Sequence, residues 1–177
     1  LGISKLKLVT GFSMGGLQSF HWAAMYPDMV ENFVPICGSA KCSGHNWLFL
    51  ESLAAALEAD SVFDSGRYTE YPEAGMNAFC AIYAAWAYSQ EFFRQEGFKN
   101  LGLESHKEMG SLLAQFFVPQ DPNDLLVRTR AWQNADISDN PKYNGNLEAA
   151  LAGITARAIV MPASTDQYFW SDDNKDE

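Results

Sequence analysis

The first residues of the chain alternate between polar and apolar side chains, and this pattern predicts a short strand. Lys5–Val9 alternates and becomes apolar towards its end, as a strand does on entering a sheet. From Gly15 to Tyr26 apolar residues recur at helical spacing, and Pro27 ends the predicted helix. Asn32–Ile36 predicts a second strand. Strand, tight turn, helix and strand together predict a βαβ unit, and therefore a parallel sheet with a right-handed crossover.

Helical periodicity dominates the middle of the chain. Four helices are predicted there, separated by Gly, Pro, Asp and Asn: Trp47–Ala59, Gly75–Gln95, Ser105–Phe117 and Asn123–Ala135. No strand pattern interrupts them, and about ninety residues exceed the length of an ordinary crossover connection. We therefore predict a helical lid, residues 46–140, inserted between the two parts of a sheet domain, residues 1–45 and 141–177.

The α/β pattern resumes after this insertion. Asn146–Leu151 predicts a short helix, and the apolar run Ala156–Met161 predicts a buried parallel strand. The loop Pro162–Asp166 follows that strand and ends on an acid. The residues after Trp170 are mostly acidic, and we expect this tail to be mobile at its end.

Composition and charge narrow the classes of partner. Of the 177 residues, 47% are hydrophobic, so the chain has ample material for a buried core. The formal net charge of −10 disfavours nucleic acids and anionic membrane surfaces, because both would repel the chain. Ala78–Ala87 is the most apolar run, and it is shorter than the roughly 18 residues a membrane helix needs. Small molecules are the predicted partners.

The cysteines and the amino-terminal residues bear on location and cofactors. Three cysteines form no secreted disulfide framework, so we predict free thiols. Cys37, Cys42 and His45 lie close in sequence, but a closed zinc site needs a fourth ligand. We predict neither a metal nor a bound cofactor. The chain begins at Leu1 with no signal-peptide pattern, which indicates the interior of a longer protein and a cytoplasmic location.

The run Gly11-Phe12-Ser13-Met14-Gly15 lies at the predicted strand-to-helix turn. A serine on such a sharp turn exposes its hydroxyl at the carboxyl edge of the sheet, as in the nucleophile turn of an α/β-hydrolase fold. Small residues at Gly11 and Gly15 are expected because strand and helix approach closely there. Ser13 is thus the predicted nucleophile. The backbone N–H of Met14 is the predicted oxyanion donor, worth about 3 kcal/mol in the transition state. The alternative is a glycine-rich turn with an inactive serine.

Asp166 is the predicted acid of a Ser-His-Asp triad. Its loop follows the last predicted strand and therefore lies at the same edge as Ser13, in the chain order of this fold. A simple turn-forming aspartate is the alternative. No histidine follows Asp166. His21 lies about 12 Å along the helix from Ser13, and His45 and His106 are expected at the surface or as caps. We therefore expect the histidine beyond Glu177.

The motifs around Ser13 and Asp166 resemble the homoserine O-acetyltransferase family of the α/β-hydrolase superfamily. The resemblance spans nearly the whole chain and is patchy between Asp60 and Asp121. Its main runs are Gly11-Phe12-Ser13-Met14-Gly15-Gly16-Leu17-Gln18, Tyr26-Pro27-Asp28, Thr129-Arg130-Ala131-Trp132-Gln133, Met161-Pro162 and Thr165-Asp166-Gln167-Tyr168-Phe169.

The resemblance implies acyl transfer through acyl-Ser13, from acetyl-CoA to a small alcohol, and a lid used in homodimer formation. Asn77–Phe93 stands where true homoserine acetyltransferases carry a basic Phe-Gly-Arg stretch, so an ester hydrolase of the same fold is an alternative. Because a histidine is missing, a non-catalytic binding module is a further alternative.

One face of a lid helix offers candidate substrate-binding residues. Arg128, Trp132 and Asp136 recur at four-residue spacing, which places them on one side of a helix. Arg128 and Trp132 are the predicted contacts to an acyl acceptor. An exposed, salt-bridged face is the alternative reading of the same spacing.

Overall fold

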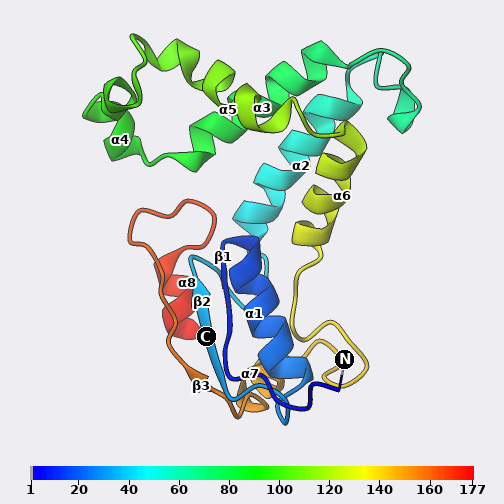
Figure 1. Ribbon diagram of the computed structural model, residues 1–177, viewed down its shortest axis with the longest axis vertical. Helices are drawn as coiled ribbons and strands as arrows, with labels where there is room; N and C mark the ends of the chain where they lie inside the picture. The colour runs from blue at the N-terminus through cyan, green and yellow to red at the C-terminus, as the bar shows by residue number, and fades with distance from the viewer. Residues whose placement is uncertain (1) are drawn as a thin grey trace. The chain divides into compact units, whose positions relative to one another are not determined.

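The computed structural model describes residues 2–177, which form two compact units (Figure 1). The sheet unit contains the residues up to Ser43 together with Asn134–Glu177, and the helical unit is Gly44–Gln133. The predicted lid ran to residue 140. In the structure, residues 134–140 pack with the sheet unit instead.

The sheet unit is built on parallel strands in the order β1-β2-β3: β1 is Val9–Phe12, β2 is Asn32–Ile36 and β3 is Arg157–Ala158. Helix α1, Met14–Met25, connects β1 to β2. The predictions for β2 and α1 are confirmed, and so is the parallel sheet. The predicted strand Lys5–Val9 was placed too early, because the ladder pairs residues 9–12 with 33–36 and only Leu6 forms a bridge before it.

Side chains of α1 and β2 form the core of the sheet unit. Phe20 of α1 meets Phe33 of β2 edge to face, with ring centroids 5.4 Å apart. Ala23 and Ala24 are fully buried beside them, so the helix lies close to the sheet. The amphipathic spacing of Gly15–Tyr26 therefore reflects a real buried face.

Helix α7, Leu147–Ala152, closes this core from the later part of the chain. Asn146 caps it, since the backbone N–H of Ala149 donates to the Asn146 side chain at 2.9 Å. The prediction of this helix is confirmed within one residue. Tyr143 in the preceding loop donates its hydroxyl to the carbonyl of Ala24, which ties the loop to the end of α1.

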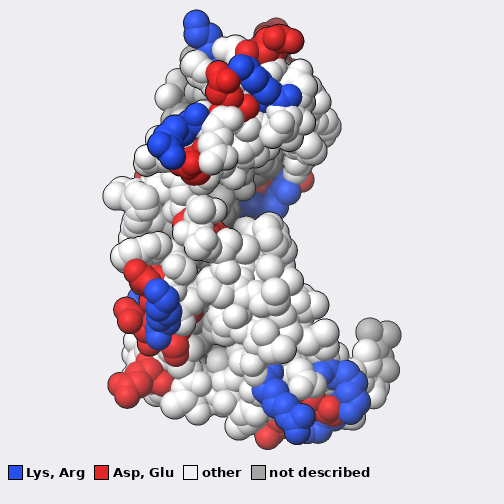
Figure 2. All heavy atoms as spheres, turned by 90° about the vertical axis from the view of Figure 1, so that its left-hand side faces the viewer, with Lys and Arg blue, Asp and Glu red and all other residues white. Residues whose placement is uncertain are grey.

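The third strand is shorter and more exposed than predicted. Beyond Ala158 the backbone continues beside β2, with the N–H of Met161 donating to the Pro35 carbonyl at 3.0 Å. Ile159 is nevertheless 64% exposed and Met161 48% exposed. Figure 2 shows this side of the sheet unit with a broad area lacking Lys, Arg, Asp and Glu. The prediction of a buried strand is wrong for the described residues, because nothing among them covers β3.

The acidic tail is structured, contrary to the predicted mobility. Ser171–Asp176 forms helix α8. Asn174 donates to the Gly38 carbonyl at 3.0 Å, and Glu177 accepts from the Ala40 N–H at 2.8 Å. Burial raises the pKa of the Glu177 carboxyl. The tail is therefore docked on the segment that follows β2.

The helical unit consists of five α-helices and short 3₁₀ turns among the described residues. The helices are α2 Gly44–Glu58, α3 Glu73–Ala87, α4 Gln90–Arg94, α5 Met109–Phe117 and α6 Pro122–Gln133. Helix α3 packs against α2 and α5, and α6 packs against α2. No helix within residues 2–177 has the length and apolarity that crossing a membrane requires.

One predicted helix of this unit is two helices. The pattern Gly75–Gln95 breaks after Ala87, because Tyr88 has an extended backbone conformation. Ser89 then caps α4 by accepting from the N–H of Phe92 at 3.2 Å. The helix predicted over Ser105–Phe117 begins with the 3₁₀ turn His106–Glu108 before α5. The remaining helices agree with prediction to within a few residues.

Candidate active site

Ser13 occupies the turn between β1 and α1 in a strained conformation. Its φ is 58° and its ψ −119°, a region that non-glycine residues rarely adopt. The Ser13 N–H donates to the Ile36 carbonyl at 2.9 Å, and the Ser13 carbonyl accepts from the N–H groups of Gly16 and Leu17. The surrounding backbone thus holds the serine in a conformation that it would not adopt alone.

Gly11 lies two residues before the serine, at a position with no room for a side chain. A Cβ added to Gly11 would lie 2.3 Å from the Gly15 carbonyl oxygen, closer than van der Waals contact allows. The matching expectation for Gly15 is wrong: within residues 2–177, nothing lies within 4 Å of a Cβ added there. The close approach of strand and helix therefore depends on Gly11, with the backbone of Gly15 as its partner.

A second close contact lies beside the turn. A Cβ on Gly38 would lie 2.8 Å from the Gly16 Cα, and a Cβ on Gly16 would lie 3.0 Å from the Gly38 Cα. Two glycine backbones thus pack directly on each other where α1 begins and β2 ends. This contact sets how near the start of α1 comes to the segment after β2.

Met14 is the first residue of α1, which runs for 12 residues. The N–H groups of a helix's first turn have no acceptor within the helix and carry the positive end of its dipole. The Met14 N–H therefore lies in a position suited to a developing oxyanion beside Ser13.

Asp166 lies in the loop that follows β3, and backbone groups hold its carboxylate. One oxygen accepts from the N–H groups of Tyr168 at 2.8 Å and Phe169 at 3.0 Å. The Asp166 N–H donates to the Ala163 carbonyl at 3.2 Å, which closes the turn. Phe169 is fully buried and anchors the loop. The turn-forming and triad interpretations are therefore compatible, since both side-chain bonds of this turn use the same carboxylate oxygen.

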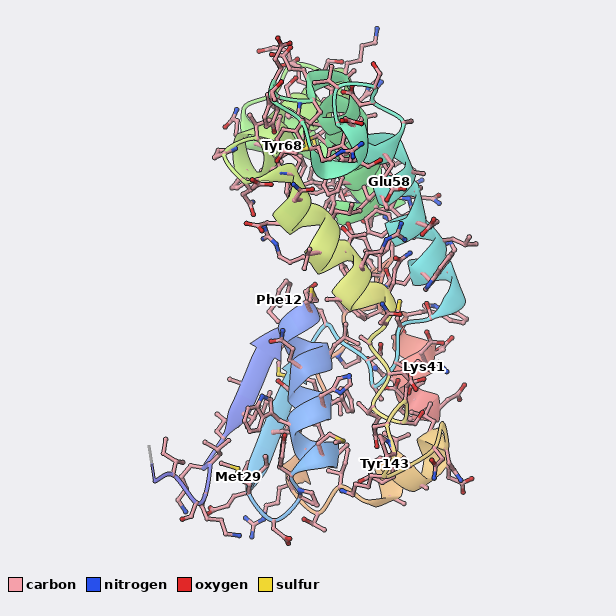
Figure 3. The ribbon with its side chains drawn as sticks, turned by 90° about the vertical axis from the view of Figure 1, so that its right-hand side faces the viewer. Phe12, Met29, Lys41, Glu58, Tyr68 and Tyr143 are labelled. Carbon is pink, nitrogen blue, oxygen red and sulfur yellow. The ribbon has the colours of Figure 1, made fainter. Side chains whose placement is uncertain are left out.

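Ser13 and Asp166 share the carboxyl edge of the sheet, as the sequence predicts. Ser13 directly follows β1 and bonds to Ile36 at the end of β2. Cys37 follows β2 and donates its N–H to the Met161 carbonyl at 2.9 Å, five residues before Asp166. In Figure 3, Phe12 marks this edge and Met29 marks the opposite one.

The two substrate-binding candidates lie in the helical unit and do not share an environment. Arg128 is exposed and donates to the Asp124 carbonyl at 3.2 Å. Trp132 is 5% exposed and lies edge to face with Phe49 of α2. Asp136 is not on their helix, which ends at Gln133; it forms an ion pair with Lys41 in the sheet unit at 2.8 Å. The predicted common helical face is therefore wrong for Asp136, whereas Arg128 and Trp132 lie four residues apart on α6.

The histidines lie on separate elements. His21 is partly buried on α1, and burial lowers its pKa while the charge of Asp136 acts in the opposite direction. The ring of His45 lies against that of Trp86 within the helical unit in a tilted arrangement, with ring centroids 4.6 Å apart. His106 begins a 3₁₀ turn. The described residues bring no three His, Cys, Asp or Glu side chains together as a metal site.

Comparisons with known proteins place this geometry in a superfamily. No family model matches the chain. An ethyl acetate hydrolase from Pseudomonas veronii is 39% identical over 175 residues, which cover 97% of this chain and 50% of that protein. A homoserine O-acetyltransferase from Zymomonas mobilis is 32% identical over 187 residues, which cover 96% and 49%. The structure of the acetyl esterase MekB matches with a TM-score of 0.94 at 38% identity, covering 99% of this chain and 51% of that one.

The chain has the fold of the α/β-hydrolase superfamily. Its relatives there include esterases and homoserine O-acyltransferases, so the resemblance to the homoserine O-acetyltransferase family is confirmed. This α/β-hydrolase chain spans about half the length of the curated relatives it matches.

Two neighbouring residues after β2 make contacts at this sheet edge that the sequence did not predict. Cys37 has a φ of 47°, and its neighbour Gly38 packs on Gly16. The sequence signal for these contacts was the pair of small residues directly after the apolar strand. This signal was weak because the sequence does not indicate which backbone segment packs against Gly38.

Proposed function

We propose that the chain carries the nucleophile and the acid of a serine enzyme that cleaves short-chain carboxylic esters. Ser13 on its strained turn is the observation that carries the proposal, since a hydroxyl held this way is poised for attack. Relatives at 37–39% identity support hydrolysis over transfer, because they are named as esterases or as an ethyl acetate hydrolase.

In the proposed reaction, Ser13 Oγ attacks the ester carbonyl and its proton passes to a histidine. A segment outside the 177 residues supplies that histidine, and Asp166 orients it. The Met14 N–H stabilises the oxyanion of the tetrahedral intermediate. The intermediate collapses, the alcohol leaves with the proton from the imidazolium, and acyl-Ser13 remains. Water then attacks acyl-Ser13 by the same steps, which releases the acid and restores the hydroxyl.

The test uses the longest natural form of the protein and p-nitrophenyl acetate. Ser13→Ala is expected to lower kcat by at least about a thousandfold, because the covalent route is lost. Ser111→Ala, an exposed serine of α5, is the matched control and should retain the activity of the unaltered protein. Ester turnover that survives Ser13→Ala would refute the proposal.

Acyl transfer is the second candidate, favoured by the identity shared with homoserine O-acetyltransferases. Here an alcohol such as homoserine replaces water in the attack on acyl-Ser13, and acetyl-CoA is the donor. Measuring CoA release with and without homoserine separates the two. A release rate that rises with homoserine would establish transfer, and Arg128 and Trp132 would then be tested as acceptor contacts.

A non-catalytic binding module of the same fold is the third candidate, and a labelling experiment can eliminate it. It predicts that a serine-reactive fluorophosphonate leaves Ser13 unlabelled in the longest natural form of the protein. Labelling at Ser13, found by peptide mass spectrometry and abolished in Ser13→Ala, would eliminate it.

A further inference from the structure

Two side chains attach helix α8 to the segment after β2 (Figure 1). They are Asn174 of α8 and Glu177, which directly follows it, and we call this pair the α8 clamp. The Asn174 side-chain amide donates to the Gly38 carbonyl at 3.0 Å and to one carboxylate oxygen of Glu177, also at 3.0 Å. The other Glu177 oxygen accepts from the Ala40 N–H at 2.8 Å. Connected hydrogen bonds therefore hold the clamp on two backbone groups of the neighbouring segment.

The segment that receives the clamp is itself fixed to the nucleophile turn. At its start, the Ile36 carbonyl accepts from the Ser13 N–H at 2.9 Å. Two residues later, a Cβ on Gly38 would lie 2.8 Å from the Gly16 Cα, so this backbone touches the first turn of α1 directly. Because backbone contacts of this kind leave little freedom, the position of α8 on the segment is also its position relative to Ser13.

The other end of α8 adjoins the loop of the candidate acid. The Asp166 carboxylate accepts from the N–H groups of Tyr168 at 2.8 Å and Phe169 at 3.0 Å. Only Trp170 lies between Phe169 and Ser171, the first residue of α8. So short a connection cannot absorb a shift of the helix. The placement of α8 therefore restricts where the Asp166 loop can lie.

The clamp differs in kind from the other polar contact of the same helix. Lys175 and Asp172 form an ion pair whose side chains are 72% and 46% exposed, and exposed pairs contribute little. Glu177 is shielded instead: burial raises the pKa of its carboxyl, while the bonds from Ala40 and Asn174 act in the opposite direction. Hydrogen bonds shielded from water are stronger, and a buried N–H without its acceptor is costly. The clamp is therefore the specific attachment of α8.

We propose that the α8 clamp fixes the Asp166 loop relative to Ser13, so that Asn174 and Glu177 are positioning residues for the acid. This role rests on the proposed function above, in which Asp166 orients a histidine beside Ser13. Without the clamp, the loop keeps its own bonds to the Asp166 carboxylate but is free to shift as a body. Misplacing a catalytic group by about 1 Å can cost about a hundredfold in rate, so a small shift is enough to matter.

A first experiment measures the effect of the clamp on the loop without any assay of activity. Hydrogen–deuterium exchange is followed by mass spectrometry in the longest natural form of the protein. In Glu177→Ala the Ala40 amide loses its acceptor, and the amides of Tyr168 and Phe169 should exchange about tenfold faster, because their loop opens more often.

The matched control is Lys175→Ala, which removes the exposed ion pair of the same helix and keeps the clamp. It should leave the exchange of the Tyr168 and Phe169 amides unchanged. Exchange at these two amides that is the same in Glu177→Ala as in the unaltered protein would overturn the proposal, because the loop would then hold its place without the clamp.

A second experiment measures the consequence for turnover of p-nitrophenyl acetate in the same form of the protein. Glu177→Ala should lower kcat about tenfold with little change in KM, since the acid is displaced and no substrate contact is removed. Glu177→Gln keeps an acceptor for the Ala40 N–H and should restore most of kcat. The double variant with Asn174→Ala should lose no more than Glu177→Ala alone, because both residues belong to one connected set. A kcat for Glu177→Ala equal to that of the unaltered protein would refute the positioning role.

The failures of the two proposals are distinguishable. Activity that persists in Ser13→Ala removes the serine mechanism, and the exchange experiment still decides whether the clamp holds the loop. Activity that depends on Ser13 but not on Glu177 removes only the positioning role. Circular dichroism identifies any variant that fails to fold. If Glu177→Ala is such a variant, Asn174→Ala takes its place in both experiments, with the same expected and contradicting results.

Discussion

At the scale of single residues, the catalytic turn combines one strained residue with one indispensable glycine. Ser13 is held at φ 58° by the hydrogen bonds of its backbone N–H and its backbone carbonyl. Gly11 makes room for the backbone of Gly15, with no space for even a methyl group. Positions of this kind lower stability where they occur and persist because the surrounding structure enforces them.

The two glycines of the motif are expected to respond oppositely to alanine. Gly11→Ala should lower the free energy of unfolding by about 2 kcal/mol or more, because the added methyl group collides with backbone. Gly15→Ala places its methyl group in open space on a helix and should raise stability by up to about 1 kcal/mol. Urea denaturation of both variants measures the difference. Equal losses would show that both positions are crowded.

Relief of the strain at Ser13 should also be measurable. Glycine adopts a positive φ without penalty, whereas alanine has the same backbone restriction as serine. Ser13→Gly should therefore be more stable than Ser13→Ala by about 1 kcal/mol, even though both lack the hydroxyl. The comparison between the two variants isolates the backbone contribution. Thermal unfolding measures the stability of each variant. Equal melting temperatures for Ser13→Gly and Ser13→Ala would argue against a strained turn.

At the scale of elements, the connection after α6 is tied to the segment after β2. Lys41 and Asp136 form an antiparallel bridge and an ion pair at 2.8 Å. The same carboxylate accepts from the N–H and the hydroxyl of Ser138. This small cluster joins the two chain segments at which the sheet unit is interrupted by the helical unit.

The Asp136 cluster should make stability depend on pH. Burial acts to raise the pKa of Asp136, but bonds from Lys41 and Ser138 outweigh it, so the pKa in the folded state is lowered. An acid with a lowered pKa stabilises the fold above its unfolded pKa, near 4, and that contribution is lost as the pH falls further. Asp136→Asn should therefore cost about 1–2 kcal/mol at neutral pH and less in acid.

The control for this prediction is Asp139→Asn, which alters an exposed carboxylate of the same loop. Chemical denaturation at neutral pH and near pH 3 provides the comparison. A loss of stability at Asp136 that stays constant between the two pH values would contradict the charged interaction as its source.

At the scale of the whole molecule, the helical unit presents apolar side chains that suit association. Leu48, Phe116 and Val127 are 63%, 65% and 66% exposed. We predict that two copies associate through this unit, so light scattering should report a dimer.

The variant Phe116→Asp should shift the distribution from dimer towards monomer, because a buried unpaired charge is costly at an interface. Gln90→Asp, at an exposed polar position, should leave it unchanged. A monomer at high micromolar concentration would disprove the prediction.

Much of the fold was readable from the sequence wherever local pattern and turn chemistry agree. The βαβ unit, the helical insertion and α7 follow from periodicity and from capping residues such as Asn146. Chain order and the strand-turn-helix motif were enough to nominate Ser13 and Asp166. The single helix predicted over Gly75–Gln95 was wrong because periodicity continues through the break, whereas the backbone at Tyr88 does not.

By itself, the sequence determined the secondary structure and the order of chemical groups along the chain, since these depend on neighbouring residues. Only the tertiary structure decided which groups meet. It placed Gly38 against Gly16, bonded the Cys37 N–H to the Met161 carbonyl and docked Glu177 on Ala40. These contacts join residues far apart in the chain, and their closeness depends on how helices and strands pack, which no local pattern encodes.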